Sequence, residues 1–459
     1  MRPPSRWSVG MTALVVLAGA VLGGPTGSAR AHGGPPRTRS VVFHPTDPDR
    51  LTLQTSYGLV LSDDGGERWR WVCPQAAAWG VGEDPPFLVT ADGTTLAALF
   101  AGLSRGEASG CSWSFPSSEL EGTFIADVVQ DPGDLARILA VESNGVGVNR
   151  LWESEDGGRT WAPTEQEGRP VLYERLRFAP SDPSRAYLSG GVAPTRDRPR
   201  TGIVYRSDDG GRTFPDDEAT DIALSEASRA VRVLAVSPID PEIVFLHVTA
   251  FDAPDELRRS DDGGRTWETV LEMTSLSGIA VDPDGDTVWA TGLDGGLQRS
   301  TDAGRTFEPV DPDLDALCVE VHDGAVYVCG RVDFQGFGLA RSTDGGATFE
   351  TVFADEADPA ACPEASEAGQ ICPDWLIDFC VDLDRDEAYC PDPGLIDAGP
   401  ANPIPGTFPD AGAMPPLEDG GGGGCRIGAG GTPRHAPVAL PFLAVAGLAF
   451  SWRWRRRRR

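Results

Sequence analysis

The sequence contains no lysine: all 39 basic residues among its 459 residues are arginine, against 69 aspartates and glutamates. The formal net charge is therefore −30. A nucleic-acid-binding protein needs a positive face for its phosphate contacts, so this balance argues against that class. Hydrophobic residues make up 40% of the chain, which is enough for a folded core and argues against wholesale disorder.

Common motifs of metal binding and nucleophilic catalysis are also missing. No C-x-x-C occurs, which leaves a thiolate zinc site or a thioredoxin-like motif without support. His44, His247 and His322 show no H-E-x-x-H or other paired spacing. Residues 102–106 match G-x-S-x-G, but they fall on an expected strand and not at the strand-to-helix turn that a nucleophile elbow requires. We interpret that match as chance.

Charge is distributed unevenly along the chain. Residues 1–31 hold three arginines and residues 425–459 hold eight, and neither segment contains an acidic residue. Residues 32–424, the body of the chain, contain the remaining 28 arginines and all 69 acidic residues, so the charge of this body is near −41. Basic terminal segments on either side of an acidic body are typical of chain ends that contact a membrane.

The first 31 residues predict a secretory signal peptide. Arg2 and Arg6 precede an apolar run over residues 9–22, and the A-x-A sequence 29–31 follows it. This order matches a cleavable signal, cut after Ala31. We therefore expect an exported protein.

The end of the chain predicts a membrane-directed tail. A Pro/Gly-rich linker over 391–424 closes with five consecutive glycines, and Cys425 follows it. An apolar stretch over 436–452 comes next, and then the arginine-rich end. Seventeen residues lie at the short edge of a membrane span, and the arginines would stay cytoplasmic.

Eight cysteines remain when Cys425 is set aside, an even number that suits disulfides in an exported chain. Cys318 and Cys329 would lie opposite each other across an Asp-Gly hairpin turn, where a bridge is possible. We expect a bridge from Cys73 to Cys111 between neighbouring repeats. The last four would form a small disulfide-stapled module over residues 356–390; they are Cys362, Cys372, Cys380 and Cys390.

A repeat determines the expected fold. The pattern Ser-x-Asp-x-Gly-x-x-Trp/Phe occurs six times, and a decayed copy over 106–113 keeps its glycine and tryptophan. The aspartates of the six copies are Asp64, Asp156, Asp209, Asp262, Asp302 and Asp344. Counting the decayed copy gives seven units of about 47 residues, each with signals for four short strands, which is the size of a propeller blade. We predict an all-β protein with a single seven-bladed β-propeller over residues 38–355.

These motifs resemble known families. The repeat resembles the Asp-box, or BNR, repeat of sialidases, sortilin-type receptors, some endoglucanases and photosystem assembly factors. This resemblance covers about residues 40–353, and it implies that the six aspartates have a structural role at the outer edge of the blades, away from the ligand face. The end of the chain, over 425–459, resembles the myxobacterial C-terminal sorting signal (MYXO-CTERM). The parts that carry this resemblance are the glycine run, the cysteine after it, the apolar helix and the arginine tail. That likeness implies a surface protein that a sorting protease cuts near Cys425, whereas a plain membrane anchor would leave the location unchanged.

Candidate ligand-binding residues lie in the loops opposite the repeated turns. The longest such loop, over 190–202, carries Arg196, Arg198 and Arg200, which could grip a sulfated or carboxylated glycan or could be solvated. Aromatic residues in or near similar loops could stack on sugars or pack in the core; they are Trp79, Tyr173, Phe251, Phe334 and Phe337. No cofactor is expected, although Asp382, Asp384 and Asp386 could form a weak calcium loop or a solvated acidic loop.

We expect a non-catalytic surface protein that recognises a glycan or a protein, or serves as a scaffold. The alternative is an exo-glycosidase of the sialidase type. The resemblance implies an arginine triad with a tyrosine and a carboxylate for that activity, and Tyr173-Glu174-Arg175 is suggestive of such a pair. The alternative therefore requires Arg175, Arg232 and Arg331 to converge in the central channel.

Overall fold

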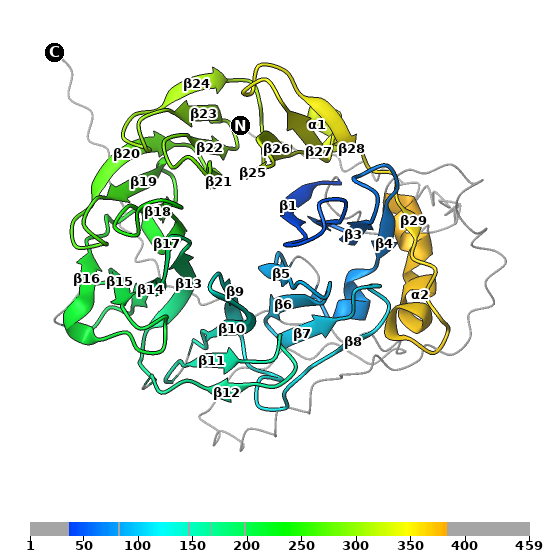
Figure 1. Ribbon diagram of the computed structural model, residues 1–459, viewed down its shortest axis with the longest axis horizontal. Helices are drawn as coiled ribbons and strands as arrows, with labels where there is room; N and C mark the ends of the chain where they lie inside the picture. Colours follow the sequence, from blue (N-terminus) through cyan, green and yellow to red (C-terminus); the bar gives the residue numbers. More distant parts are fainter. Residues whose placement is uncertain (1–35, 81–82, 146, 167, 197–198, 383–459) are drawn as a thin grey trace, which may run out of the picture. The chain divides into compact units, whose positions relative to one another are not determined.

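Seven sheets follow one another along the chain, each built from four consecutive antiparallel strands, and the first sheet gains a fifth, parallel strand from the segment after the last blade. The computed structural model describes residues 36–80, 83–145, 147–166, 168–196 and 199–382. All of these belong to one compact unit, Met1–Ala401, and a second unit, Asn402–Arg459, lies outside the described residues. The sheets are arranged around a central channel as the blades of a propeller (Figure 1), which confirms the predicted all-β seven-bladed fold.

Each blade contributes one strand to each of four concentric layers. The innermost strands are β1 (Thr38–Phe43), β5 (Phe87–Val89), β9 (Ile125–Asp131), β13 (Leu172–Ala179), β17 (Ser228–Val236), β21 (Leu276–Val281) and β25 (Cys318–His322). The second strands are β2 (Leu51–Thr55), β6 (Thr95–Leu99), β10 (Asp134–Glu142), β14 (Asp182–Val192), β18 (Val244–Ala250), β22 (Val288–Gly292) and β26 (Ala325–Cys329).

The two outer layers complete the blades. The third strands are β3 (Gly58–Ser62), β7 (Gly102–Gly106), β11 (Leu151–Ser154), β15 (Thr201–Ser207), β19 (Asp255–Ser260), β23 (Gly296–Ser300) and β27 (Leu339–Ser342). The outermost strands are β4 (Arg70–Val72), β8 (Trp113–Ser114), β12 (Ala162–Pro163), β16 (Ala219–Ile222), β20 (Glu268–Met273), β24 (Glu308–Asp311) and β28 (Glu350–Phe353).

Short elements lie between and after the blades. They are the 3₁₀ turns η1 (Pro74–Ala77) and η2 (Asp216–Glu218), the helices α1 (Val332–Gln335) and α2 (Glu367–Asp382), and the strand β29 (Asp358–Pro359). Among the described residues no helix is long and apolar enough to cross a membrane. The predicted signal peptide with Ala31, the linker, Cys425 and the apolar stretch over 436–452 all lie outside those residues.

The core lies between neighbouring blades. Strands β2, β3, β6, β22 and β26 are buried at every position. A strand in the middle of a blade has both faces covered by adjacent blades, so a continuous apolar run suits it better than strict alternation. This explains sequences such as Ile138–Val141 of β10, in which four consecutive apolar residues have no exposed surface.

The six Ser-x-Asp-x-Gly turns join third and fourth strands and share one hydrogen-bond network. In the turn at Asp302, the Ser300 hydroxyl donates to Oδ1 at 2.7 Å, and the Thr306 N–H and hydroxyl donate to the carboxylate at 2.9 and 2.7 Å. The Gly304 N–H donates to Ser300 Oγ at 2.9 Å, and this glycine has a φ of 77°, in the left-handed region that glycine adopts without strain. The six carboxylates are thus occupied within their own turns.

The aromatic residue of the repeat closes the same turn. Trp161 and Trp267 each donate an indole N–H to the carbonyl of the turn glycine three residues earlier, at 3.2 and 3.0 Å. Trp113 of the decayed copy does the same to Gly110 at 2.8 Å. The decayed unit has therefore kept the tryptophan contact that fastens the turn.

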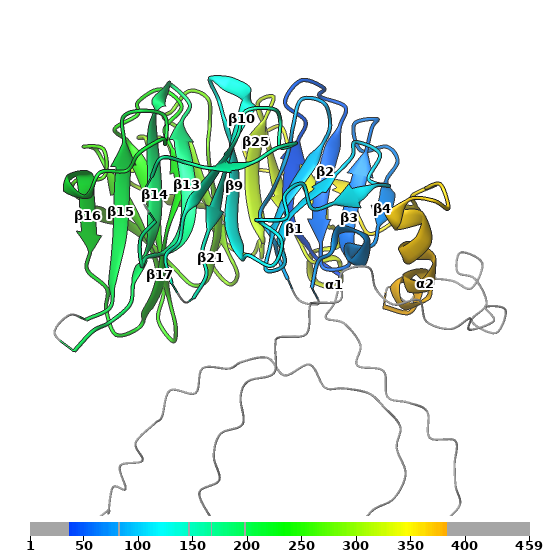
Figure 2. The same cartoon turned by 90° about the horizontal axis from the view of Figure 1, so that it is seen from below.

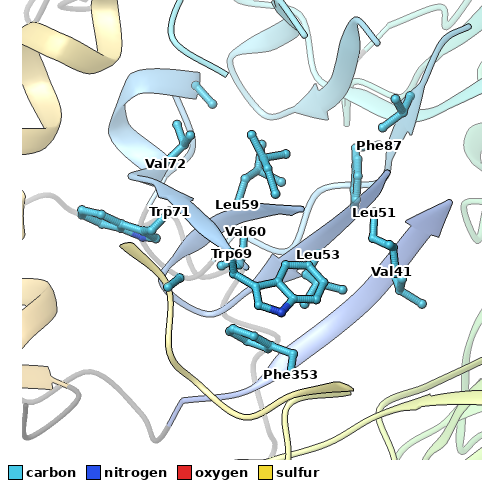
Figure 3. Close-up of a cluster of buried hydrophobic side chains, with 14 of the residues drawn as sticks. Val41, Leu51, Leu53, Leu59, Val60, Trp69, Trp71, Val72, Phe87 and Phe353 are labelled. Carbon is cyan, nitrogen blue, oxygen red and sulfur yellow. The ribbon is translucent and has the colours of Figure 1, made fainter. Parts of the chain in front are cut away.

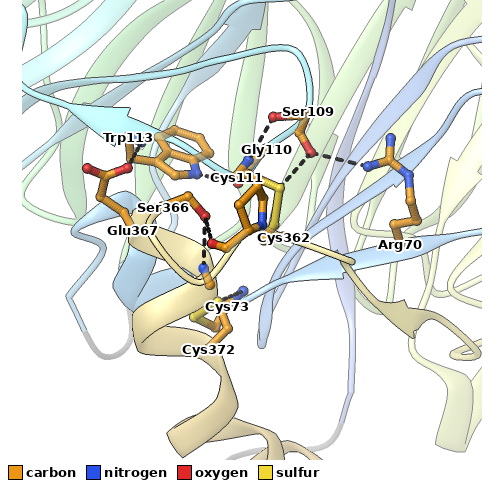
Figure 4. The surroundings of a disulfide bond; sticks show 12 residues. Arg70, Cys73, Ser109, Gly110, Cys111, Trp113, Cys362, Ser366, Glu367 and Cys372 are labelled. Carbon is orange, nitrogen blue, oxygen red and sulfur yellow. Dashed lines mark hydrogen bonds between the residues drawn. A yellow bond between two sulfur atoms is a disulfide. The ribbon is translucent and has the colours of Figure 1, made fainter.

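The disulfides differ from the expected pairing. Cys318 and Cys329 are bonded across the β25–β26 hairpin, as considered possible from the sequence. The expected Cys73–Cys111 bridge is wrong, because Cys73 is bonded to Cys372 and Cys111 to Cys362 (Figure 4). These two cysteines of the 356–390 segment are therefore not bonded within a separate module; both fasten that segment to the propeller.

Nothing further is described of the other two predicted module cysteines. Cys380 falls in the final part of α2 whose side chains lie outside the described ones, and Cys390 lies beyond the described residues. The aspartates considered for calcium have the same status: Asp384 and Asp386 lie beyond that range, and the side chain of Asp382 is not described. Within the part of the chain that the structure covers, no group of three metal-ligating side chains occurs.

Candidate functional site

The innermost strands of all seven blades enclose a cavity of about 1310 Å³ along the propeller axis. Its walls carry arginines on β1, β13 and β17 and carboxylates on β9 and β25. One end of the cavity is formed by the β18–β19 loop, Phe251–Pro254, and by the connections into β5 and β21. The cavity is large enough for a small molecule, a sugar unit or a short chain segment.

A buried aspartate holds two arginines on the channel wall. Asp127 of β9 accepts a hydrogen bond from Arg175 Nη1 at 3.0 Å and from Arg177 Nη1 at 2.8 Å, and its side chain is 2% exposed. The Leu176 N–H donates to the same carboxylate at 2.9 Å. Arg177 also donates Nε to the Leu234 carbonyl of β17 at 3.1 Å, so it spans from blade three to blade five. One carboxylate thus balances two guanidinium groups, which leaves one positive charge in excess.

A third arginine completes the basic cluster. Arg232 of β17 lines the same cavity and donates Nε to Glu174 at 3.0 Å. Burial lowers the pKa of Arg175, Asp127 opposes that effect, and the nearby positive charges of Arg177 and Arg232 lower the pKa further. The three guanidinium groups therefore repel one another, and an anion among them would relieve that repulsion.

Glu320 lies in the middle of β25 and lines the channel. Its side chain is exposed to the channel, and no described residue forms a hydrogen bond or an ion pair with it. The surrounding channel walls deprive it of bulk solvation, which raises its pKa to about 7, while Arg177 acts in the opposite direction. Glu320 thus changes its charge near neutral pH.

A histidine–aspartate pair lies near the loop end of the channel. His247 Nε2 is 3.0 Å from Asp255 Oδ2, and both residues line the cavity. Burial alone would raise the pKa of Asp255, but hydrogen bonds from His247 and from the Ala250 N–H at 2.7 Å hold it below its ordinary value. The pair fixes the start of the β18–β19 loop, which carries Phe251.

Large exposed apolar side chains gather at one end of the propeller. This end, here called the loop face, consists of the connections between second and third strands and of those between blades; Figure 2 shows the sheets from the side, with α1 at this end. The opposite end carries the Ser-x-Asp-x-Gly turns. Of the seven large hydrophobic side chains exposed among the described residues, five lie on the loop face: Phe100, Val148, Leu172, Phe251 and Phe334.

Two of these phenylalanines are paired with arginines. The Arg331 guanidinium lies 3.8 Å from the Phe334 ring centre, and that of Arg229 lies 5.3 Å from the Phe251 ring centre. The rings of Phe334 and Phe251 are 63% and 62% exposed. Exposed rings beside fixed cations offer both a stacking surface and hydrogen-bond donors to a partner.

The predicted site residues divide into exposed and buried groups. Phe251 and Phe334 are exposed on the loop face, whereas Trp79, Tyr173 and Phe337 are buried in the core and cannot contact a ligand there. Their loops fold back against the blades, so their apolar rings are removed from water.

The predicted three-arginine grip in the 190–202 loop is not assembled by the described residues. Arg200 donates to the Ser228 carbonyl of the next blade, which holds the loop against β17. Arg196 is exposed, and Arg198 lies outside the described residues.

The arrangement required for sialidase-type catalysis is incomplete. Arg175 and Arg232 do line the channel, but Arg331 does not; it is paired with Asp315 at 2.6 Å and with the Phe334 ring. Tyr173 is 1% exposed and does not line the cavity either. Burial raises the pKa of its hydroxyl to about 12, with Tyr205 adding to the effect, which disfavours the phenolate that a nucleophile needs.

The sequence interpretation missed Asp127, Arg177 and Glu320. Arg177 could have been found, because it is two residues after Arg175 on an expected innermost strand, and such residues point to the same side. Asp127 and Glu320 also lie on innermost strands, but only the packing of separate blades brings them to the same channel.

Comparison with known proteins finds similar solved structures. No protein-family profile matches the chain, and no curated protein matches it in sequence. Similar solved structures include an ancestral GH74 enzyme, with 15% identity and a TM-score of 0.46 over 70% of this chain and 54% of that one. The GH74 xyloglucanase from Xanthomonas campestris has 20% identity and a TM-score of 0.28 over 68% of this chain and 55% of its own. This chain thus spans about half the length of these two enzymes.

YCF48 proteins are also similar in fold. YCF48 bound to a D1 peptide has 13% identity and a TM-score of 0.42 over 67% of this chain and 93% of its own. YCF48 from Cyanidioschyzon merolae has 13% identity and a TM-score of 0.43 over 65% of this chain and 96% of its own. The class that can be stated is a seven-bladed β-propeller, and it rests on the strand topology of this chain.

Proposed function

We propose that this chain is an exported, surface-displayed recognition protein without catalytic activity, which binds a glycan or a protein at the loop face of its propeller. The observation that carries the proposal is the presence of three exposed phenylalanines on that face: Phe100, Phe251 and Phe334, of the second, fifth and seventh blades, are 66%, 62% and 63% exposed. Exposed aromatic side chains cost solvation free energy in a monomer and are enriched at binding surfaces.

The channel behind this face supports an acidic ligand. Arg175, Arg177 and Arg232 line it, and the first two share the single carboxylate of Asp127. Guanidinium groups bind carboxylates and sulfates in a planar, two-pronged geometry. A sulfated or carboxylated glycan, or an acidic peptide segment, would complement the guanidinium groups of Arg175 and Arg177, which share that one carboxylate.

Disulfides support the proposed location. Six cysteines form three bridges among the described residues, and such bonds persist in oxidising compartments outside the cytoplasm. Together with the expected signal peptide and C-terminal tail, this favours export and display at the cell surface. Kinship with Asp-box proteins and processing of the tail near Cys425 by a sorting protease are part of the same proposal.

The exo-glycosidase alternative is favoured by one observation. Asp127, Glu174 and Glu320 lie in or beside the channel together with two of the three required arginines. Against it stand the burial of Tyr173 and the engagement of Arg331 with Asp315.

Two assays on the secreted chain distinguish the alternatives. The first is hydrolysis of a fluorogenic sialoside, and the second is binding to an array of neutral, sulfated and carboxylated glycans and acidic peptides, each with R175A as the matched variant. We expect no turnover, and binding to acidic members that R175A reduces about tenfold or more. Turnover that R175A abolishes would overturn the non-catalytic function in favour of the glycosidase.

A further inference from the structure

The propeller has a seam between its last and first blades. At the other six blade boundaries the chain itself passes from one blade to the next. The first blade consists of β1–β4 and the last of β25–β28, so neither of these two blades shares any of its four strands with the other. The seam is therefore the one boundary that the continuous chain between β1 and β28 does not cross.

Non-covalent contacts cover the seam. The Thr38 N–H donates to the Gly330 carbonyl at 3.1 Å, and the Phe43 ring stacks on His322 at 4.0 Å. Trp69 and Phe353 meet with ring centres 5.1 Å apart, and Figure 3 shows the two rings facing each other beside Leu53. Because these contacts are few, the seam can open by local unfolding while the other blades stay folded.

The segment after the last blade crosses the seam. We name residues 357–376 the strap. It pairs as β29 in parallel with β4, where the Asp358 and Ala360 N–H groups donate to the Trp69 and Trp71 carbonyls at 2.9 Å each. It then reaches the second blade, where the Ala368 N–H donates to the Cys111 carbonyl at 3.0 Å.

Contacts between the helix α2 and the second blade hold the C-terminal end of the strap. The Trp113 N–H donates to Glu367 Oε2 at 3.1 Å, and Ala368 is 2% exposed. Ile371, Trp375 and Leu376 pack against the core cluster that continues from the last blade into the first two. The strap, which follows the last blade in the chain, thus contacts the first and second blades.

Two disulfides turn these contacts into a covalent link. Cys73, directly after β4, is bonded to Cys372 across 299 residues, and Cys111 of the second blade is bonded to Cys362 across 251 residues. The chain between the bonded cysteines contains blades two to seven for the first bridge, and β8 with blades three to seven for the second. The third bridge, Cys318–Cys329, spans 11 residues within one hairpin and does not cross the seam.

We infer that the strap is the device that closes the propeller ring, and that its two disulfides make closure depend on an oxidising compartment. Each bridge forms when two thiols give up two electrons and two protons to a disulfide-form thiol oxidant, which becomes a dithiol. Before this reaction the seam opens by local unfolding; after it the first and last blades are held together covalently. The inference concerns the ring and is independent of which ligand the loop face binds.

The test is amide hydrogen exchange on the folded, secreted chain before and after treatment with a thiol reductant. Mass spectrometry of labelled cysteines establishes which bridges are reduced. The C318S/C329S variant is the matched control, since it lacks the hairpin bridge and keeps both strap bridges. Because reduction is applied to protein that has already folded, the result does not depend on the folding of a strap variant.

We expect reduction of the strap bridges to raise exchange in β1, β4 and β28 by about 100-fold, while β13–β19 keep their protection. C318S/C329S without reductant should match the wild type at the seam. The A360P variant, which removes the donor to Trp71 and keeps both bridges, should raise exchange at β4 alone. Unchanged exchange at the seam after full reduction, or simultaneous loss of protection in all blades, would overturn the inference.

Discussion

Arg177 on β13 and Asp127 on β9 are joined across two blades by a hydrogen-bonded ion pair of 2.8 Å. The carboxylate is almost fully enclosed, and its other oxygen accepts Arg175 at 3.0 Å. Removing the charge of Asp127 would leave two partly exposed guanidinium groups without a counter-ion. The ion pairs of Arg175 and Arg177 therefore depend on a single aspartate.

The variant D127N should lower the free energy of unfolding by about 3 kcal/mol, because one member of an enclosed charge cluster is lost. Urea denaturation measures this. E218Q is the matched control, since Glu218 pairs with Arg265 at 3.6 Å on the surface, where such pairs contribute about 0–1 kcal/mol. Equal stabilities for the two variants would show that the channel cluster does not stabilise the fold.

The aspartates of the Ser-x-Asp-x-Gly turns should make the protein less stable as the pH falls. Hydrogen bonds from Thr348 hold the pKa of Asp344 at about 2, and hydrogen bonds from Thr160 and Ser154 hold that of Asp156 at about 2 although burial would raise it. An unfolded aspartate has a pKa of about 4. The stabilisation is therefore fully present above about pH 4 and is lost as the pH falls through the folded values.

Urea midpoints measured across this pH range test the expectation. The wild-type midpoint should fall between about pH 4 and 2, as the turn aspartates become protonated. D344N should show a shallower decline, since its turn no longer titrates. A wild-type midpoint that does not change over this window would contradict the account of the turns.

Glu320 should have the opposite pH dependence. Its pKa is about 7 in the folded channel, raised from an ordinary value of 4.5. The folded state then binds more protons than the unfolded state, so this residue's contribution is fully present below about pH 4.5 and is lost as the pH rises through 7. E320Q should flatten that decline and be more stable than the wild type above pH 7; identical pH profiles would disprove the shift.

Some of the arginines form hydrogen bonds from one blade to the next, which explains in part why the chain uses arginine and no lysine. Arg259 of β19 is buried and donates Nε to the Ala303 carbonyl of the next blade's turn at 2.6 Å, while Nη1 pairs with Asp261 at 2.6 Å. Arg137 and Arg299 make the same type of bond to Gly210 and Gly345. A lysine ammonium cannot reach two such acceptors in one plane.

R259K should therefore destabilise the protein by about 2 kcal/mol, whereas R305K, at an arginine on the exposed turn surface, should stay within about 0.5 kcal/mol of the wild type. Thermal unfolding of both variants provides the comparison. A large effect at residue 305 with none at residue 259 would rule out the inter-blade role of the buried arginines.

The fold was predictable from the sequence because the repeated turn uses local chemistry. Serine, aspartate and glycine at fixed spacing form the same network six times, so the blades can be counted before any packing is known. The pairing of Cys73 with Cys372 was not predictable, since it depends on where the strap runs after the last blade. The burial of Trp79 and Phe337 likewise depends on how their loops fold back.

The channel was predictable only in part. Arg175 was identified by its place beside Tyr173, and it does line the cavity, whereas that tyrosine points into the core. Residues from blades three, four and seven meet in the channel, and no spacing along the chain encodes their proximity. Phe251 and Phe334 were found because loop position alone made them candidates.

The most direct test of the recognition face is a binding comparison on the glycan and peptide array with matched phenylalanine and isoleucine variants. F251A/F334A removes two exposed rings of the loop face, and I239A removes an equally exposed side chain from the opposite end, where Ile239 is 57% exposed. The account predicts that F251A/F334A loses binding about tenfold or more while I239A binds as the wild type does. Full binding by F251A/F334A, or loss of binding in I239A, would contradict it.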